Sequence, residues 1–188
     1  MKRIILGSNS PRRRELLAGL DVSFTVDTGN RFEEILPAGA QAREVPLLMS
    51  EGKSHGFHRP LEPDEVLITS DTVVIVEGEV LGKPHSRAQA QQMLQKLSGR
   101  THEVVTAVTL RDAVREKTFS VSTQVVFAEL TRQEIDYYID KYQPYDKAGA
   151  YGIQEWIGYV GISSIEGSFY NVMGFPVHRV WKELQDFL

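Results

Sequence analysis

The chain has 188 residues, of which 41% are hydrophobic and 24% are charged, and this composition is typical of a globular protein. Its formal net charge is −4, so no overall basic field favours nucleic acid or an anionic membrane as a partner. The chain contains no cysteine, which excludes a disulfide scaffold, a thiolate metal site and a cysteine nucleophile.

The start of the sequence is not typical of a secreted or membrane-inserted protein. Its apolar run, residues 4–6, is far shorter than a signal-peptide core or the roughly 20 residues that cross a bilayer. We therefore expect a cytoplasmic protein that binds neither membrane nor nucleic acid. Dimers are the commonest soluble assembly, so a homodimer is the first assembly to consider.

Short apolar runs alternate with helical patterns along the whole chain. The runs that predict strands are residues 4–6, 22–26, 65–76, 80–81, 102–110, 118–127, 157–165 and 169–173. The helical patterns are residues 11–19, 42–55, 87–97, 132–142 and 176–187. This order predicts a single α/β domain over residues 1–188, with a mixed β-sheet and flanking helices.

Capping residues mark where several of these helices begin. Ser10 and Ser86 are suited to accept a hydrogen bond from the first turn of the helix that follows each of them. Thr131 has a glutamate three residues later, which is the pattern of a capping box. The helix predicted over residues 42–55 has weaker support, because Pro46 and Gly52 both disfavour a helix interior.

The run Ser8-Asn9-Ser10-Pro11-Arg12-Arg13-Arg14 lies between a predicted strand and a predicted helix. A helix N-terminus presents unpaired N–H groups and a partial positive charge. Hydroxyl and guanidinium groups added at that point favour a phosphate site. From these residues alone, a phosphate site and an ordinary capped helix with exposed arginines have equal support.

Asp71 interrupts an apolar strand pattern at Ser70-Asp71-Thr72. A carboxylate is rarely buried unless it is paired or binds a metal, so its position indicates a strand end that opens on a cleft. There Asp71 would serve as a Mg²⁺ ligand, as a general base, or as both. The residues alone slightly favour the alternative, an aspartate that bonds to the backbone of a turn.

Two lysines and one glutamine are further candidates for a nucleotide site. Lys53 and Lys83 could each offer a point charge to phosphate, although an isolated lysine is more often a solvated one. Gln154 follows the glycine-rich run of residues 146–152, and its amide could read the edge of a base. A tight loop that merely needs glycine is the more common meaning of such a run.

The histidines and one group of tyrosines are interpreted as structural. The histidines lack a metal-ligand spacing that includes further ligands, so we expect surface or packing roles for His55, His58, His85, His102 and His178. The tyrosines at helical spacing are expected to pack, and they are Tyr137, Tyr138 and Tyr142.

Several runs stand in a colinear order that is specific when they are taken together. Ser8-Asn9-Ser10-Pro11-Arg12-Arg13 resembles an S-x-S-P-R-R signature, and Ser70-Asp71-Thr72-Val73-Val74 resembles an A/S-D-T-x-V motif. The other matching blocks are residues 82–84, 97–102, 146–154 and 165–176. With these motifs the chain resembles the Maf family of nucleotide pyrophosphatases over nearly its whole length.

The resemblance implies an α/β fold similar to that of the inosine triphosphate pyrophosphatases, with two lobes around a cleft. It implies hydrolysis of nucleoside triphosphates to the monophosphate and pyrophosphate, with a divalent cation, Mg²⁺ or Mn²⁺. The run of residues 146–154 is similar to the subgroup that acts on dTTP and UTP, whereas the sister subgroup acts on 7-methyl-GTP. The family was once described as septum-formation inhibitors, so a non-catalytic nucleotide-binding regulator of cell division is the alternative.

The resemblance also implies roles for particular residues. Asp71 stands at the position of the family's proton acceptor. The residues at positions that bear on substrate choice are Arg12, Thr72 and Gln154. Those expected to bind the triphosphate are Ser8, Arg12, Arg13, Lys53 and Lys83. The expected metal ligands are Asp71 and one residue of the Glu33-Glu34 pair, and Glu34 is the better match.

Lys53 matches the family pattern less closely than the other site residues. It lies in Ser50-Glu51-Gly52-Lys53-Ser54, where the family often has an Ala-x-x-Lys-Ala stretch.

Overall fold

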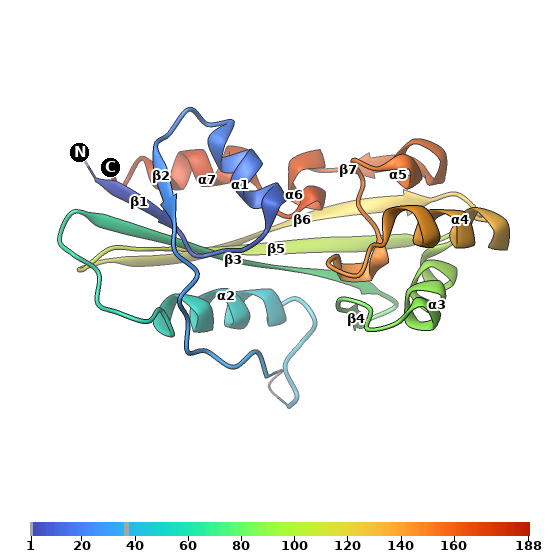
Figure 1. Cartoon of the computed structure of the whole chain (residues 1–188), viewed down its shortest axis with the longest axis horizontal. Coiled ribbons are helices and arrows are strands. Elements are labelled where there is room, and N and C mark those ends of the chain that lie inside the picture. Colours follow the sequence, from blue (N-terminus) through green and yellow to red (C-terminus); the bar gives the residue numbers. More distant parts are fainter. Residues whose placement is uncertain (1, 36–37) are drawn as a thin grey trace. The chain divides into compact units, whose positions relative to one another are not determined.

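The structure is a computed structural model that describes residues 2–35 and 38–188. Its strands are β1 (Arg3–Leu6), β2 (Phe24–Val26), β3 (Glu65–Val76), β4 (Glu79–Leu81), β5 (Thr101–Arg111), β6 (Glu116–Phe127) and β7 (Ile162–Glu166). Its helices are α1 (Pro11–Ala18), α2 (Val45–His55), α3 (Arg87–Leu97), α4 (Arg132–Tyr142), η1 (Ala148–Ala150), α5 (Trp156–Gly161), α6 (Phe169–Met173) and α7 (Val177–Leu184) (Figure 1). Among the described residues, no helix is long and apolar enough to span a membrane.

The strands form one mixed sheet. Within the described residues it has seven strands in the order β2-β1-β3-β5-β6-β7, and β4 also pairs with β3. β1 is parallel to β2 and β3, whereas β4 is antiparallel to β3 and β7 is antiparallel to β6. The predicted α/β class with a mixed sheet is therefore confirmed.

The chain divides into two compact units. Unit 1 comprises Met1–Asp71, Thr106–Val121 and Gly174–Leu188, and unit 2 comprises Thr72–Val105 and Ser122–Met173. The long strands β3, β5 and β6 each contribute residues to both units. Two compact parts agree with the expected lobes, and the cleft expected with them stays a prediction.

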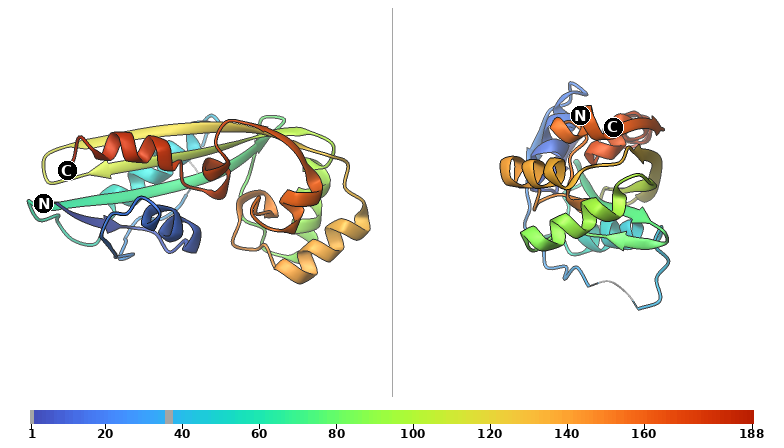
Figure 2. Two further views of the ribbon diagram at one scale, coloured as in Figure 1. Left: turned by 90° about the horizontal axis from the view of Figure 1, so that it is seen from above. Right: turned by 90° about the vertical axis from the view of Figure 1, so that its right-hand side faces the viewer.

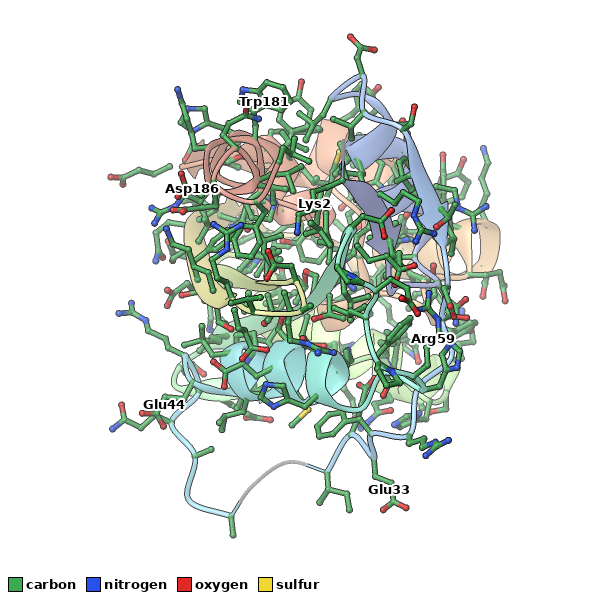
Figure 3. All side chains as sticks on the ribbon, turned by 90° about the vertical axis from the view of Figure 1, so that its left-hand side faces the viewer. Lys2, Glu33, Glu44, Arg59, Trp181 and Asp186 are labelled. Carbon is green, nitrogen blue, oxygen red and sulfur yellow. The ribbon has the colours of Figure 1, made fainter. Side chains whose placement is uncertain are left out.

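Helices cover both faces of the sheet in unit 1. α2 lies against one face, and α1 and α7 lie against the other (Figures 1 and 3). The helices bury apolar side chains against the strands, including Leu16, Leu17, Met49, Val180 and Leu184. The buried strand residues facing them are short apolar runs, Ile4 to Leu6 and Val66 to Ile68. Burial of these runs fixes β1 and β3, which position the Ser8 turn and Asp71.

Two features of α2 have a physical explanation: the helix starts later than expected, and it contains a glycine in its interior. The helix begins at Val45 rather than at residue 42, because Pro46 is tolerated only in a first turn, where its missing N–H would have no helical partner. Gly52 lies inside the helix, and a Cβ atom there would stand 2.2 Å from two ring atoms of Phe32. The glycine thus makes room for an aromatic ring from the loop before α2.

β3 runs without interruption through Ser70, Asp71 and Thr72. The expectation that Asp71 marks a strand end is therefore wrong. The carboxylate is accommodated inside the strand because Lys53 pairs with it. The neighbouring Ser70 is buried, and its hydroxyl donates to the carbonyl of Ala107 at 2.8 Å. A polar residue inside a strand is stable when it has such a partner.

Unit 2 contains a helix pair together with the residues of β3, β5 and β6 that do not belong to unit 1. α3 and α4 lie side by side (Figure 2), and Arg87 of α3 forms ion pairs with Asp136 and Asp140 of α4. The predicted caps at Ser86 and Thr131 are confirmed, the second as a complete capping box. Tyr138 is fully buried, which confirms its expected packing role.

The C-terminal part of unit 2 contains two errors of prediction. Residues 157–165 form α5 and then β7 rather than one strand, because Ile157 and Gly161 are buried at helical spacing. Residues 169–173 form the short helix α6 instead of a strand. The hydroxyl of Ser168 accepts a hydrogen bond from the backbone N–H of Asn171 at 3.2 Å, and this N-terminal cap outweighs the β-branched and aromatic composition.

Candidate functional site

The turn between β1 and α1 is fixed by hydrogen bonds among its own residues. The hydroxyl of Ser10 accepts from the backbone N–H of Arg13 at 3.4 Å and so caps α1, as predicted. The hydroxyl of Ser8 accepts from the backbone N–H of Ser10 at 3.2 Å. Together these bonds hold the N-terminus of α1 and its partial positive charge beside the Ser8 side chain.

Arg13 connects this turn to β3 and to the segment before α7. Its Nη1 atom donates to the hydroxyl of Ser8 at 3.3 Å and to the carbonyl of Ser70 at 3.1 Å. Its Nε atom donates to the carbonyl of Gly174 at 2.9 Å. The guanidinium group therefore helps to fix the turn in addition to bringing a positive charge.

The electrostatics of Arg13 show which groups surround it. Burial lowers the pKa of its guanidinium, and the neighbouring charge of Arg12 adds to this effect. Asp71 and Glu34 act in the opposite direction, because negative charges favour the protonated form. Arg12, Arg13, Glu34 and Asp71 thus share one electrostatic environment in unit 1.

Lys53 joins the two candidate carboxylates. Its Nζ atom lies 2.8 Å from an Oδ atom of Asp71 and 3.1 Å from an Oε atom of Glu34. The side chains of Lys53 and Asp71 are 18% and 16% exposed, whereas that of Glu34 is 60% exposed. The ammonium and the aspartate are therefore partly shielded from water, which strengthens their attraction.

The loop that carries Glu34 is hydrogen-bonded to the C-terminal end of α2 and to Gly56, which follows it. The side-chain amide of Asn30 donates to the carbonyl of Lys53 at 2.6 Å, and the backbone N–H of Arg31 donates to the carbonyl of Gly56 at 2.8 Å. Phe32 lies between these hydrogen-bonded residues and Glu34 in the sequence, and its ring occupies the space left by Gly52. Figure 3 shows the exposed side chain of Glu33 directed outward from the loop, so Glu34 is the member of the pair that faces Lys53.

Unit 1 brings most of the predicted site residues together. A hydroxyl, two guanidinium groups, an ammonium group and two carboxylates gather around the middle of β3, and they belong to Ser8, Arg12, Arg13, Lys53, Glu34 and Asp71. Such a set suits a ligand that carries phosphate together with a cation, because the positive groups meet the anion and the carboxylates meet the cation.

The remaining predicted residues, Thr72, Lys83 and Gln154, belong to unit 2. Thr72 follows Asp71 in β3, and successive side chains of a strand point to opposite faces. Lys83 is exposed and follows Gly82, whose carbonyl accepts from the backbone N–H of Gly149 at 3.1 Å. That bond ties the Lys83 segment to the glycine-rich loop.

Gly149 explains why the loop of residues 146–154 is rich in small residues. Its φ angle is +68°, a conformation that favours glycine, and a Cβ atom there would stand 2.9 Å from the side chain of Val74. Further along, the hydroxyl of Tyr138 accepts from the backbone N–H of Gly152 at 2.9 Å and donates to Glu155 at 3.1 Å. The loop is therefore held at Gly149 and at Gly152.

Gln154 lines a cavity of about 460 Å³ that lies wholly within unit 2. Its Oε1 atom is buried and has no hydrogen-bond partner among the described residues. The other residues of the wall are mostly apolar or carry hydroxyl groups, and they are Ile153, Gly158, Tyr159, Ile162, Ser163, Ser164, Ile165 and Phe169. A buried acceptor without a donor costs free energy.

Sequence reasoning missed some residues that shape these sites. Phe32 and Gly52 position the Glu34 loop, and the glycine inside a helix was the signal that could have found them. Phe169 lies in the C-terminal block of the family resemblance but was assigned to a strand. Tyr159 is 84% exposed at the cavity wall, and nothing in the sequence marks it.

The donor set at Lys53 fits a divalent cation in its chemistry. Within residues 2–35 and 38–188, no group of three or more His, Cys, Asp or Glu side chains could hold a metal ion. Glu34 and Asp71 nevertheless already converge on one cationic group, the ammonium of Lys53. Two carboxylates are an ordinary protein contribution to a Mg²⁺ site, where waters and substrate phosphates supply the other ligands.

The fold and the unit 1 cluster define an α/β protein with a site suited to a phosphate ligand and a cation. The family model described as "Maf-like protein" matches residues 3–187, and the chain belongs to this family.

Relatives of the chain carry the name "dTTP/UTP pyrophosphatase". One from Porphyromonas gingivalis is 51% identical over 187 residues, which cover 98% of this chain and 94% of that protein. One from Phocaeicola vulgatus is 51% identical and one from Bacteroides thetaiotaomicron is 49% identical, each over 97% of this chain and 95% of that protein. A solved structure titled "Structure of a HAM1 protein from Coxiella burnetii" has a TM-score of 0.49 at 15% identity, covering 99% of this chain and 100% of that chain.

Proposed function

We propose that this protein hydrolyses dTTP and UTP to the nucleoside monophosphate and pyrophosphate, with a divalent cation, in the cytoplasm. The names of relatives that are 51% identical over nearly the whole chain support this activity. The structural observation that carries the proposal is the convergence of cationic and carboxylate groups around Lys53 and Asp71 in unit 1.

The phosphates of the substrate bind to the turn that begins α1. The hydroxyl of Ser8 and the helix N-terminus offer hydrogen-bond donors, and Arg12 adds a guanidinium charge. Arg13 contributes positive charge from a fixed position, since its hydrogen bonds tie it to Ser8 and Ser70. Lys53 and Lys83 supply further charges to the triphosphate.

Glu34 and Asp71 hold the divalent cation. When bound, such a cation stabilises charge on the transferring phosphoryl group and makes a coordinated water more acidic. Asp71 orients the attacking water and accepts its proton. The water oxygen bonds to the α-phosphorus, the bond from this phosphorus to the bridging oxygen breaks, and pyrophosphate leaves with that oxygen. No covalent intermediate on the protein is required.

Gln154 and Thr72 select the base. Uracil and thymine both present a ring N–H donor, and the buried Oε1 atom of Gln154 is an acceptor without a partner among the described residues. Cytosine has an acceptor at the same ring position, so it would leave the glutamine unsatisfied. A site that must hydrogen-bond a base edge discriminates strongly against a base that lacks the matching group.

The proposal is tested with a panel of nucleoside triphosphates in Mg²⁺ and in Mn²⁺, with separate detection of monophosphate and pyrophosphate. We expect fastest turnover of dTTP and UTP, with both products in equal amounts. Preferred turnover of 7-methyl-GTP would contradict the base assignment. Tight nucleotide binding without product would contradict catalysis and favour a regulator of cell division. Light scattering of the same preparation tests the expected homodimer.

A further inference from the structure

We propose that Lys53 is the resident counter-ion of the Glu34–Asp71 pair and must leave it before a divalent cation binds there. This inference rests on the proposed function, because that function is what brings a divalent cation to the two carboxylates. It adds that the cation site is already filled by a charged group of the chain itself.

The geometry places one ammonium group between the two carboxylates. The Nζ atom lies 2.8 Å from an oxygen of Asp71 and 3.1 Å from an oxygen of Glu34. An ammonium is a compact charge with three N–H donors, so it can serve both partners at once. With Lys53 and Asp71 at 18% and 16% exposure, water screens their attraction only in part.

A metal ion and this ammonium group exclude each other from the position they would share. Mg²⁺ binds carboxylate oxygens at about 2.1 Å. The ion would therefore occupy the side of these two oxygens that now faces the ammonium group. The two positive charges would then stand only a few ångströms apart in a partly dehydrated place, which is strongly unfavourable.

The side chain of Lys53 can leave while its backbone stays in place. The carbonyl of Lys53 accepts from the side-chain amide of Asn30, and the residue belongs to the last turn of α2, so its main chain is anchored. The four-carbon stem is flexible and can carry the charge to a new partner. A substrate phosphate is the natural partner for an ammonium released beside a bound cation.

A role for Lys53 in preorganising the two carboxylates predicts the opposite effect on metal binding. If Lys53 preorganised the two carboxylates for the metal, its removal would leave Glu34 and Asp71 to repel each other and would weaken metal binding. If Lys53 competes with the metal, its removal must strengthen metal binding. The sign of one measured change therefore separates the two roles.

The experiment is a titration with Mn²⁺ in the absence of nucleotide, with free Mn²⁺ measured by electron paramagnetic resonance. The variants are Lys53→Met, which removes the charge and keeps the stem, and Lys53→Arg, which keeps the charge. Lys182→Met is the matched control, because it removes one exposed positive charge from α7 in the same unit. Asp71→Asn in the Lys53→Met background shows whether the Mn²⁺ binds at the carboxylate pair.

We expect Lys53→Met to bind Mn²⁺ about tenfold more tightly than the wild type, since removal of a nearby competing charge is worth at least that much. Lys53→Arg and Lys182→Met should keep the wild-type affinity, and Asp71→Asn should abolish the gain. The inference is overturned if Lys53→Met binds Mn²⁺ equally or more weakly, if neither protein binds it, or if the gain survives Asp71→Asn.

Thermal unfolding of each variant is measured alongside, and Lys53→Gln replaces Lys53→Met if the methionine variant does not fold. Because no nucleotide is present, the titration gives its answer whether or not the nucleotide panel finds turnover. A failed panel with a tighter Lys53→Met site would remove the enzyme assignment and keep the competition between cations.

Discussion

Phe32 lies on Gly52, with ring atoms 2.2 Å from the place where a Cβ atom would stand. This contact connects a helix interior to the loop that carries Glu34. Alanine is a better helix former than glycine by about 1 kcal/mol, so helix propensity alone would favour Gly52→Ala. The glycine is retained against that preference because the ring must pack there, two residues before the candidate metal ligand.

Gly52→Ala should therefore lower activity while α2 itself remains helical. The added methyl group displaces Phe32, and the loop moves Glu34 away from Lys53. We expect kcat/KM for dTTP to fall about tenfold, in line with the loss of one charge-assisted ligand contact of about 1.4 kcal/mol. Steady-state kinetics with circular dichroism checks this. Gly19→Ala is the control, because its Cβ atom would meet nothing closer than 3.4 Å, and an equal loss there would contradict the explanation.

Asp71→Asn should nearly abolish hydrolysis of dTTP and leave the fold intact. The amide keeps the shape of the carboxylate and can still accept a hydrogen bond from Lys53, but it cannot take a proton from water. Removal of a general base typically lowers kcat by about 10²- to 10⁴-fold. Pyrophosphate release measures the effect, and an unchanged thermal unfolding transition shows that the fold is intact. Wild-type turnover in Mg²⁺ would refute the assigned role.

Glu34→Gln and Glu33→Gln should differ sharply, although the residues are neighbours. Glu34 contacts Lys53 at 3.1 Å, whereas the exposed side chain of Glu33 is directed outward (Figure 3). We expect Glu34→Gln to raise the Mg²⁺ concentration needed for half-maximal activity, because a neutral amide is a weaker ligand than a carboxylate. Glu33→Gln should leave that concentration unchanged. Equal effects of the two substitutions would show that the metal-ligand role does not belong to Glu34 in particular.

The elements with strong local signals could be predicted from the sequence, and those set by packing could not. The Ser10, Ser86 and Thr131 caps are local patterns, and each begins a helix as expected. The uninterrupted course of β3 depends on a partner for Asp71 that comes from a distant helix, so the sequence around Asp71 does not show it. The helix at 169–173 depends on a cap at Ser168 that composition hides.

The candidate site also has features that local sequence signals predict and features that only packing sets. The types of residue that bind phosphate and metal could be chosen from the motifs, and unit 1 brings Ser8, Arg13, Lys53 and Asp71 together. The direct Lys53 pairing with both carboxylates could not be predicted, because it depends on how α2 packs against β3. The cavity beside Gln154 is likewise a product of packing within unit 2.

Gln154→Leu should weaken the preference for uracil and thymine. Leucine has a similar volume but no acceptor, so the base N–H loses the partner that the buried Oε1 atom offers. We expect kcat/KM for UTP to fall about tenfold to a hundredfold, and the value for CTP to change little. Competing hydrolysis of the two nucleotides measures the ratio directly. Gln133→Leu, on the exposed face of α4, is the control. An unchanged ratio in Gln154→Leu would exclude this residue from base selection.

His102 should make the protein less stable in mild acid. It is 2% exposed and its Nε2 atom lies 2.6 Å from the hydroxyl of Tyr151, and burial lowers its pKa from 6.5 to about 4. Between these two pH values His102 is protonated in the unfolded chain but not in the folded protein. The free energy of unfolding therefore falls as the pH drops from about 6.5 towards 4, and His102 does not affect it above 6.5. Urea unfolding at pH 7 and pH 5 should show a loss of about 2 kcal/mol that His102→Gln largely removes. His85→Gln, at an exposed position, should keep the wild-type loss, and an equal loss in His102→Gln would place the acid sensitivity elsewhere.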